Sequence, residues 1–410
     1  MLKNKRAPFV LLIILSFIIL GCGVLYMHEN PAVPKVHLLF EQWHSKYIKA
    51  TADGNYVNGA LPPQKKATAL SESQGYGMLV TIQAAQKGWA TQHDFNRLVT
   101  YYLNHQINAQ NHLMAWKQTK EGNSMVTAAK NNVSATDGDL DIAYSLLQAD
   151  SFWGSTGKVN YQQLAHKILN SLLRYTYQRE TNLLTVGDWA LNSPQYSKLI
   201  RTSDLIPAYY QYFYRKTKNQ SWKLIAKKSV AVLNTLSAQN KTGLLPDFAY
   251  SHLNTVSSAT PYSLEGANDG NYAWNATRIP WRLALNNSQV LQKINKKLLS
   301  FFAKQSTIHA GYTLSGKQLV PYSSMAFTAP IAVAAMQNSK QFAALSAATK
   351  KSVLNDKLTG NYYADTLQVL SAFSLENMGG KIMNKVLYFD LIVSILLLIT
   401  FYLAKKRIFF

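Results

Sequence analysis

The sequence predicts an all-α protein in which about a dozen helices form two concentric rings of six, flanked by two transmembrane helices. Three observations lead to this prediction. Apolar residues recur every three to four positions through the body, loops rich in Gly, Asn and Ser separate the segments with this spacing, and a long apolar run lies near each end. Strand-like alternation is scarce, and no short repeat period supports a solenoid.

The two apolar runs orient the chain in a membrane. Residues 7–27 are uncharged, about as long as the roughly 20 residues that cross a bilayer core, and preceded by basic residues. Residues 386–404 contain a single charge and are followed by basic residues. By the positive-inside rule, residues 1–6 and 405–410 are cytoplasmic. We therefore expect the domain of residues 28–385 to lie outside a bacterial cell membrane, in contact with membrane lipid through both anchors.

Alternatives exist for each run. The first also fits a signal anchor or a cleaved signal peptide, and Cys22 lies in a weak likeness to a lipoprotein cleavage site. The second would otherwise be a buried core helix. Because Cys22 is the only cysteine, the exported body forms no internal disulfide, and its stability must come from burial of a core.

The chain is strongly basic. Its 42 Lys and Arg residues exceed its 20 Asp and Glu residues, which gives a net charge of +22. The basic residues are scattered rather than grouped in stripes with aromatic residues, so no nucleic acid is expected as a partner. Such an excess favours anionic lipid or wall polymer as surroundings and argues against a strongly cationic substrate.

The helices are predicted from apolar spacing in the body of the chain. Two segments, 75–85 and 140–149, are apolar nearly all round, as expected of helices in an inner ring. The loops at one end of the rings would then hold the polar site residues. The candidate helices span residues 37–50, 75–85, 92–103, 139–149, 161–175, 206–217, 221–238, 276–286, 288–304, 324–336, 341–356 and 365–373.

The first motif with chemical content is Ser71-Glu72-Ser73-Gln74-Gly75-Tyr76-Gly77-Met78. Ser71 and Gln74 have the spacing of a capping box, which places Glu72 in the first turn of a helix. An isolated glutamate there is usually a favourable charge at a helix N-terminus. Two glycines in the next turn each cost about 1 kcal/mol against alanine, which indicates close approach of a backbone or a ligand and favours a functional role.

The second motif is Ala135-Thr136-Asp137-Gly138-Asp139-Leu140-Asp141. Three acids in five residues are unusual in a chain with so few acids. One structural interpretation is that Asp137 caps a helix and Asp139 opposes its dipole. Three crowded carboxylates nevertheless favour a functional site.

Together these segments resemble glycoside hydrolase family 8. The second motif agrees with the family signature at nearly every constrained position, and the likeness covers about residues 72–373. It continues at Ala115-Trp116, Gly187-Asp188-Trp189, Ser203-Asp204 with Pro207, Leu245-Pro246-Asp247-Phe248 and Arg278-Ile279-Pro280-Trp281-Arg282. The resemblance implies an (α/α)6 barrel with an open acidic cleft and inverting hydrolysis of β-1,4-type glucans, xylans or chitosan. It implies no metal and no organic cofactor.

The resemblance also implies residue roles. Glu72 is the general acid, and Asp137 contacts the sugar at the cleavage point, where it favours substrate distortion and stabilises charge. The best-known members place the base as an aspartate where this chain has Asn275, and an amide cannot accept the proton of water. A branch of the family takes its base from a glutamate about ten residues earlier, so we predict Glu265 as the base, with Asp269 as the second choice. A solvated surface loop is the structural alternative for both acids.

Further residues are predicted to bind substrate. Trp116, Trp189 and Tyr272 lie beside the matched motifs, as does Trp274, and would stack on sugars, although tryptophans are more often core residues. Asp139 and Asn275 would form hydrogen bonds with sugar or water. Arg278 and Arg282 are expected to anchor the cleft by pairing with carboxylates.

Three functions are compatible with these observations. The first is a membrane-anchored endo-β-glucanase, cleaving β-1,4-type or mixed-linkage glucan, that serves synthesis or trimming of an exported polysaccharide beside a membrane polysaccharide synthase. The second, prompted by Asn275, is a catalytically inactive glycan-binding or scaffold protein. The third is a chitosanase or xylanase of the same family.

Overall fold

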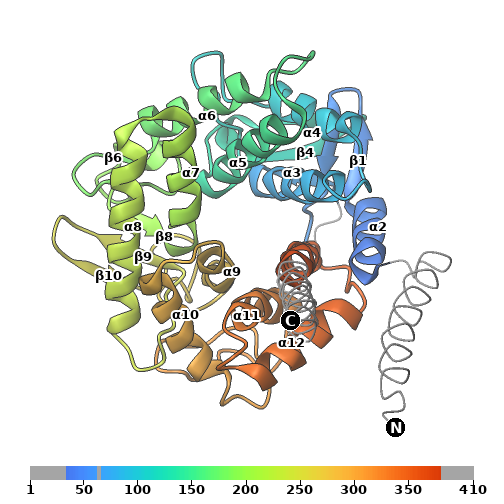
Figure 1. Cartoon of the computed structure of the whole chain (residues 1–410). Coiled ribbons are helices and arrows are strands. Elements are labelled where there is room, and N and C mark those ends of the chain that lie inside the picture. Colours follow the sequence, from blue (N-terminus) through green and yellow to red (C-terminus); the bar gives the residue numbers. More distant parts are fainter. Residues whose placement is uncertain (1–33, 62–65, 380–410) are drawn as a thin grey trace, which may run out of the picture.

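A computed structural model describes residues 34–61 and 66–379 of the 410-residue chain. Twelve α-helices lie in this part and dominate it (Figure 1). They are α2 (Lys35–Tyr47), α3 (Ser71–Ala85), α4 (Gln92–Asn104), α5 (Thr136–Trp153), α6 (Tyr161–Tyr175), α7 (Pro207–Thr217), α8 (Gln220–Ala238), α9 (Ile279–Ala284), α10 (Gln289–Phe302), α11 (Met325–Gln337), α12 (Ala343–Asn355) and a last helix over residues 362–379.

Burial divides the helices into an inner and an outer ring. Helices α3, α5, α9 and α11 and the last helix bury most of their residues, and α7 completes their ring. Helices α2, α4, α6, α8, α10 and α12 bury one face and expose the other, as expected for an outer ring against water. Figure 1 shows the two kinds alternating around a closed circle.

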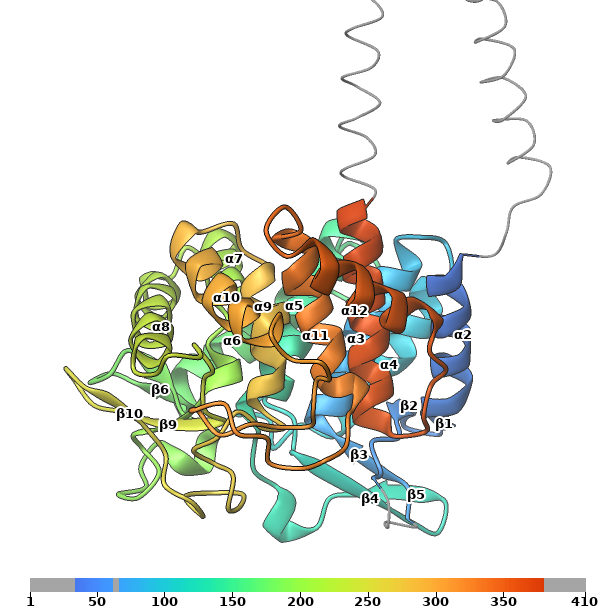
Figure 2. The same ribbon diagram turned by 90° about the horizontal axis from the view of Figure 1, so that it is seen from below.

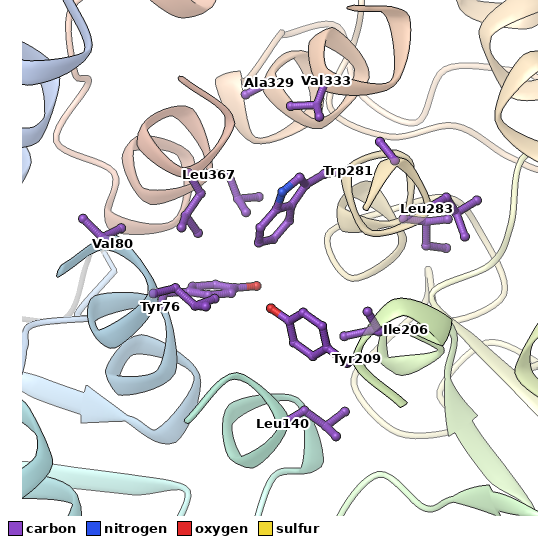
Figure 3. Packing of buried hydrophobic residues seen from close by; sticks show 14 of the residues in the cluster. Tyr76, Val80, Leu140, Ile206, Tyr209, Trp281, Leu283, Ala329, Val333 and Leu367 are labelled. Atoms are coloured by element: carbon purple, nitrogen blue, oxygen red, sulfur yellow. The ribbon is translucent and has the colours of Figure 1, made fainter. Parts of the chain in front are cut away.

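The core runs through the middle of the inner ring. Side chains from successive inner helices, including Tyr76, Leu140, Tyr209, Trp281 and Leu367, converge there (Figure 3). Because the inner helices other than α7 are largely surrounded by neighbouring helices, their sequences lack the usual continuous polar stripe.

Short antiparallel strands complete the loops. Strands β1 (Ile48–Thr51) and β2 (Gly54–Val57) form one hairpin, and β6 (Tyr177–Gln178) pairs with β7 (Leu183–Leu184). Two three-stranded sheets have the orders β3-β4-β5 and β10-β9-β8. Their members are β3 (Thr68–Leu70), β4 (Lys117–Glu121), β5 (Ser124–Val126), β8 (Leu199–Arg201), β9 (Phe248–Ser251) and β10 (Val256–Ser258). The sheets gather at one end of the barrel, at the bottom of Figure 2.

The predicted fold class is wrong in two respects. The protein is mostly helical rather than all-α, because long loops at one end pair their backbone groups in strands too short and too polar to show in the sequence, as in the Lys-Gln-Thr-Lys-Glu of β4. The flanking transmembrane helices are not part of the observed fold, and both runs, 7–27 and 386–404, fall outside the described residues. Within residues 34–61 and 66–379, none of the helices combines the length and apolar character needed to span a bilayer.

Candidate active site

The site begins where α3 and α5 cross. A Cβ on Gly138 would lie 2.4 Å from the backbone carbon of Ser71, and one on Gly75 would lie 2.8 Å from the Cβ of Asp141. Only glycine permits this approach, which brings the first turns of the two helices together. Glu72 and Asp137 lie in those first turns. The glycines noted in the sequence therefore allow the close approach of a second helix.

The start of α3 is held differently from the predicted capping box. Ser71 is already helical, and its hydroxyl has no partner in the described part of the chain. Ser73 Oγ instead accepts a hydrogen bond from Leu70 N (2.9 Å), and Ser71 N donates to the carbonyl oxygen of Trp116 (3.0 Å). Gln74 is used elsewhere, since its amide donates to carbonyl oxygens of β2 and α4. The prediction that Glu72 lies in the first turn is confirmed.

Glu72 has the surroundings of a proton donor. Its carboxylate lies 3.4 Å from the guanidinium of Arg278, and 20% of its side chain is exposed. Burial of most of the carboxyl group raises its pKa to about 7, because desolvation and the nearby Asp137 outweigh the opposing charge of Arg278. Glu72 therefore holds its proton under mildly acidic conditions and is about half protonated near neutral pH.

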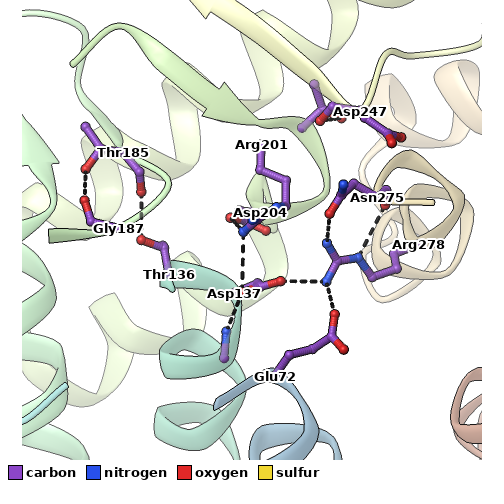
Figure 4. A network of polar contacts seen from close by, with 12 residues as sticks. Glu72, Thr136, Asp137, Thr185, Gly187, Arg201, Asp204, Asp247, Asn275 and Arg278 are labelled. Atoms are coloured by element: carbon purple, nitrogen blue, oxygen red, sulfur yellow. Dashed lines mark hydrogen bonds and ion pairs between the residues drawn. The ribbon is translucent and has the colours of Figure 1, made fainter. Parts of the chain in front are cut away.

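Asp137 has the opposite electrostatic environment. Its Oδ2 lies 2.9 Å from Arg278 Nη1, and its Oδ1 lies 3.4 Å from Arg201 Nη1 (Figure 4). Burial opposes ionisation, but Arg201 and Arg278, with a backbone hydrogen bond from Gly138 N, lower the pKa to about 2. Asp137 thus stays ionised beside a protonated Glu72. Neighbouring carboxyl groups with separated pKa values are typical of acid–base catalysis.

A hydrogen-bonded chain leads from Glu72 to Glu265. Arg278 Nη2 donates to Asn275 Oδ1 (2.9 Å), and Asn275 Nδ2 donates to Glu265 Oε2 (2.9 Å). Glu265 also lies 3.4 Å from Arg201, and half of its side chain is exposed. The structure therefore brings together five of the predicted site residues: Glu72, Asp137, Glu265, Asn275 and Arg278.

Asp269, the second choice for the base, is directed into its own loop. Its Oδ2 accepts hydrogen bonds from Leu264 N (2.7 Å) and Glu265 N (3.1 Å), and its Oδ1 accepts one from Gly266 N (2.9 Å). The side chain is buried. This arrangement fixes the turn that presents Glu265 and leaves Glu265 as the more accessible carboxylate.

Several predicted substrate-binding residues differ in exposure. Asp139 is fully buried and accepts a hydrogen bond from Met114 N (2.8 Å), and Tyr272 is a core residue that packs against Phe302 and Phe327. The structure does not bring these two side chains to the surface. Trp189 is 37% exposed.

The other two tryptophans also reach the surface. Trp274 is exposed and meets Tyr363 edge to face, and Tyr363 donates a hydrogen bond to its carbonyl oxygen. Trp116 is partly exposed, with the ammonium group of Lys117 5.4 Å from its ring centre. Trp116, Trp189 and Trp274 are therefore free to contact a ligand, as Asp139 and Tyr272 are not.

The expected pairing of the two arginines with carboxylates is confirmed. Arg278 contacts Glu72 and Asp137, and Arg282 Nη2 lies 2.6 Å from Asp141 Oδ2. Both guanidinium groups are buried. The second pair lies on the core side of the site, because Asp141 follows Asp137 by one helical turn.

Sequence reasoning missed three charged residues. Arg201 is the last residue of β8 and pairs with Asp137, Asp204 and Glu265. Burial raises the pKa of Asp204 to about 7 against the opposing charge of Arg201. Asp247 accepts hydrogen bonds from Ala273 N (3.0 Å) and Ala276 N (2.6 Å), and burial raises its pKa to about 7. The motifs containing Asp204 and Asp247 were noted, whereas Arg201 had no signal beyond adjacency to one of them.

The fold and this site together define a class of enzyme. A ring of helices holds a protonated carboxylic acid, an ionised aspartate and an exposed glutamate at one end. These are the groups needed to cleave a glycosidic bond by acid–base catalysis. In residues 34–61 and 66–379, no group of three or more His, Cys, Asp or Glu side chains is arranged to hold a metal ion. The protein is a glycoside hydrolase.

Comparison with known proteins identifies the family. Residues 29–375 match the family described as "Glycosyl hydrolases family 8", and the chain belongs to that family. It is 34% identical to the "Beta-glucanase" of Niallia circulans over 343 residues, 81% of each chain. It is 28% identical to "Endoglucanase A" of Acetivibrio thermocellus over 340 residues, 81% of this chain and 67% of that one.

Solved structures agree on the fold. The apo β-1,3-1,4-glucanase from Paenibacillus sp. X4 has a TM-score of 0.75 and 31% identity, covering 84% of this chain and 91% of that one. A cold-adapted family 8 xylanase has a TM-score of 0.70 at 20% identity, covering 84% and 90%, and shows the fold alone. The observed fold is therefore the (α/α)6 barrel of the family.

Proposed function

We propose that this protein is an inverting endo-hydrolase of β-glucan in which Glu72 is the general acid and Glu265 the general base. The observation that supports this most directly is the electrostatic asymmetry of the site. Glu72 has a pKa of about 7 and is largely enclosed. Glu265 is half exposed, and hydrogen bonds through Arg278 and Asn275 connect it to Glu72. One carboxyl group thus has a proton to give, and the other is open to water.

The reaction follows from these two states. Glu72 transfers its proton to the glycosidic oxygen as the bond from that oxygen to the anomeric carbon breaks. Glu265 takes a proton from a water molecule, whose oxygen attacks the anomeric carbon from the opposite face. The leaving sugar gains a hydroxyl group, the new reducing end has inverted configuration, and Glu265 then returns its proton to solvent.

Asp137 has the charge needed to support the transition state. Positive charge develops on the ring oxygen and anomeric carbon as the bond breaks, and a fixed carboxylate nearby stabilises it. Arg201 and Arg278 keep Asp137 ionised, so this charge is present before substrate binds. Such a group needs no reorganisation during the reaction.

Relatives support β-glucan as the substrate class. The two relatives compared over most of this chain are a β-glucanase and an endoglucanase, and the structure at 31% identity is a β-1,3-1,4-glucanase. The exposed rings of Trp189 and Trp274 offer apolar surfaces of the kind that pack on glucose units. Xylan and chitosan are the comparison substrates that test this choice.

The catalytic roles are tested with two matched variants. Glu72→Gln and Glu265→Gln should each lower kcat on mixed-linkage β-glucan by about 10²–10⁴-fold, the usual contribution of a general acid or base. Trp189→Gln, at the same end of the barrel, should change KM more than kcat. Unchanged turnover in either glutamine variant, with an unaltered melting temperature, would remove that residue from its role. NMR of fresh products should show the α-anomer first.

An inactive glycan-binding protein was suggested by Asn275. Asn275 cannot act as a base itself, but it donates a hydrogen bond to Glu265 and so orients a carboxylate that can. The presence of an asparagine at this position is therefore compatible with catalysis. The active enzyme is the function that these contacts favour.

We also infer that the domain works on the extracytoplasmic side of a bacterial cell membrane, near a polysaccharide synthase. The basic residues that flank both terminal apolar runs motivate this placement. Protease treatment of intact spheroplasts should digest the domain, and the full chain should remain in the membrane fraction. Protection from the protease, or recovery in the soluble cytoplasm, would contradict the placement.

A further inference from the structure

A pocket lies at the opposite end of the barrel from Glu72. It has a volume of about 940 Å³, within the usual range for ligand sites. Gln83 and Gln86, at the end of α3, line it together with residues from the final turns of α9 and α11. Eleven residues of helix separate Glu72 from Gln83, which corresponds to about 17 Å along the axis of α3.

The lining of this pocket is rich in amides and poor in charge. Nine of its 22 lining residues are Gln or Asn, two are lysines (Lys296 and Lys340), and none is Asp or Glu. An amide offers donors and an acceptor side by side, which suits a ligand whose hydroxyl groups do both. Two lysines are too few to favour a polyanionic ligand, and a lining without carboxylates disfavours a cationic one. The many amides disfavour a wholly apolar ligand.

Several polar groups of the pocket lack partners within the described residues. Trp281 Nε1 and Gln337 Oε1 are buried without a hydrogen bond, and Trp281 is 3% exposed. The side-chain amides of Gln86 and Gln148 form no hydrogen bond with the described part of the protein. Buried polar groups are normally satisfied, so the two buried atoms indicate a missing partner with both donors and acceptors.

Aromatic rings form the floor. Tyr144 stacks on Tyr209 with ring centres 3.8 Å apart and planes at 7°. The side chains of Tyr209 and Trp281 both point toward the middle of the ring of helices (Figure 3). Tyr144, Leu285 and Asn287 also line a shallower hollow of about 290 Å³ that adjoins the pocket. The two depressions extend the site into a groove past Tyr144.

A polar layer of the core separates this pocket from the catalytic site. Arg282 donates to Tyr209 OH (2.8 Å) and pairs with Asp141, and Tyr209 OH donates to Asp141 Oδ1 (2.9 Å). Tyr76 lies on the other side, where its OH accepts a hydrogen bond from Arg278 (3.1 Å). The pocket is therefore distinct from the site that contains Glu72.

We propose that this amide-lined pocket is a second, non-catalytic binding site for an uncharged oligosaccharide segment. Aromatic floor and amide walls are the two kinds of contact that a neutral sugar needs, namely an apolar face for its C–H surface and paired donors and acceptors for its hydroxyls. A site of this kind holds a long polysaccharide on the enzyme between cleavage events and raises the local concentration of chain ends and internal bonds. Short oligosaccharides gain nothing from it in turnover.

Binding is tested in the full chain with hydrolysis blocked by Glu72→Gln. Isothermal titration with cellotetraose should give two sites per protein in this variant and one when Gln86→Ala and Gln148→Ala are added. These two side chains make no hydrogen bonds within residues 34–61 and 66–379, so their truncation should leave the melting temperature unchanged. Gln162→Ala, on the exposed face of α6, is the matched control and should retain both sites. An unchanged stoichiometry in the Gln86/Gln148 variant would overturn the proposal.

Turnover provides a second readout in the otherwise native enzyme. The Gln86→Ala/Gln148→Ala variant should raise KM for soluble mixed-linkage β-glucan at least threefold and leave kcat/KM for cellotetraose unchanged. The choice of glucan as the probe rests on the proposed function, but binding in the pocket does not require cleavage. A parent protein that binds two cellotetraose molecules and cleaves no glucan would contradict the proposed function and leave the second site intact. Equal KM values for the polymer in variant and parent would contradict the role in holding long chains.

Discussion

At the scale of single residues, Arg278 sets the chemistry of the site. Its buried guanidinium group contacts Glu72, Tyr76, Asp137 and Asn275 at once. A guanidinium presents five donors in a rigid fork, so one residue can fix the positions of several oxygens, which a lysine cannot do. Its charge also keeps Asp137 ionised while desolvation keeps the proton on Glu72.

The pKa of Glu72 predicts the alkaline side of the pH profile. The general acid must be protonated, so kcat/KM should fall as pH rises through about 7. Asp137 raises the pKa of Glu72 by charge repulsion, so Asp137→Asn should move this alkaline limb to lower pH while lowering the rate. Initial rates measured between pH 4 and pH 9 check both expectations. A limb that stays in place in Asp137→Asn would show that Glu72 is not the titrating group.

At the scale of elements, the crossing of α3 and α5 positions the two first turns. Gly138→Ala would place a methyl group 2.4 Å from the backbone of Ser71, and neither helix can move without disturbing the inner ring. Overpacking of this kind costs about 1–3 kcal/mol, so urea denaturation should show a free energy of unfolding lower by at least that amount. Gly157→Ala, where a Cβ meets nothing within 4 Å, is the control and should be close to neutral. Similar losses in both variants would contradict the tight crossing.

The loop that presents Glu265 depends on Asp269. Asp269→Ala removes the acceptor of three backbone N–H groups and frees Glu265 to move. Because a misplacement of about 1 Å can cost about 10²-fold in rate, we expect kcat to fall by tenfold or more. The melting temperature should also fall, because the buried Asp269 leaves three backbone N–H groups without their acceptor, so kcat is measured well below the unfolding transition. Asp269→Asn, which keeps one acceptor oxygen, should have an intermediate kcat; full activity in the alanine variant would mean that the loop holds its shape without these bonds.

At the scale of the whole molecule, the buried carboxyl groups make stability depend on pH. Burial raises the pKa of Glu72, Asp204 and Asp247 to about 7 each, above their values in the unfolded chain. Their contribution is fully present below about pH 4 and is lost as pH rises through 7. Asp137, with its pKa lowered to about 2, contributes stability that is lost only as pH falls below about 4.

The free energy of unfolding should therefore be greatest near pH 4–5 and fall toward pH 8. Urea titrations across this range measure it. Asp247→Asn, whose amide oxygen can still accept from Ala273 N and Ala276 N, should reduce the slope between pH 5 and pH 8. A slope equal to that of the parent protein would exclude Asp247 as a contributor.

The helices could be predicted well because the spacing of apolar residues within each segment indicates which face of that helix is buried. The helix at 161–175 has the predicted bounds, whereas the predicted helix at 37–50 gives way to β1 after Tyr47. Strands β1 to β10 were missed, since their pairing depends on partners elsewhere in the chain. Asp139 shows a finer error: two residues after Asp137 on a helix, it faces another direction and is buried.

The sequence by itself determined the ring of helices, the family likeness and the acids that begin α3 and α5. These are local properties, because apolar spacing and a motif are complete within one segment. The tertiary structure alone decided which carboxyl group keeps its proton, that Arg201 joins the site, and that amides from several helices line a pocket at the opposite end of the barrel. Those properties depend on desolvation and on charges that approach from segments far apart in the chain, which no single segment records.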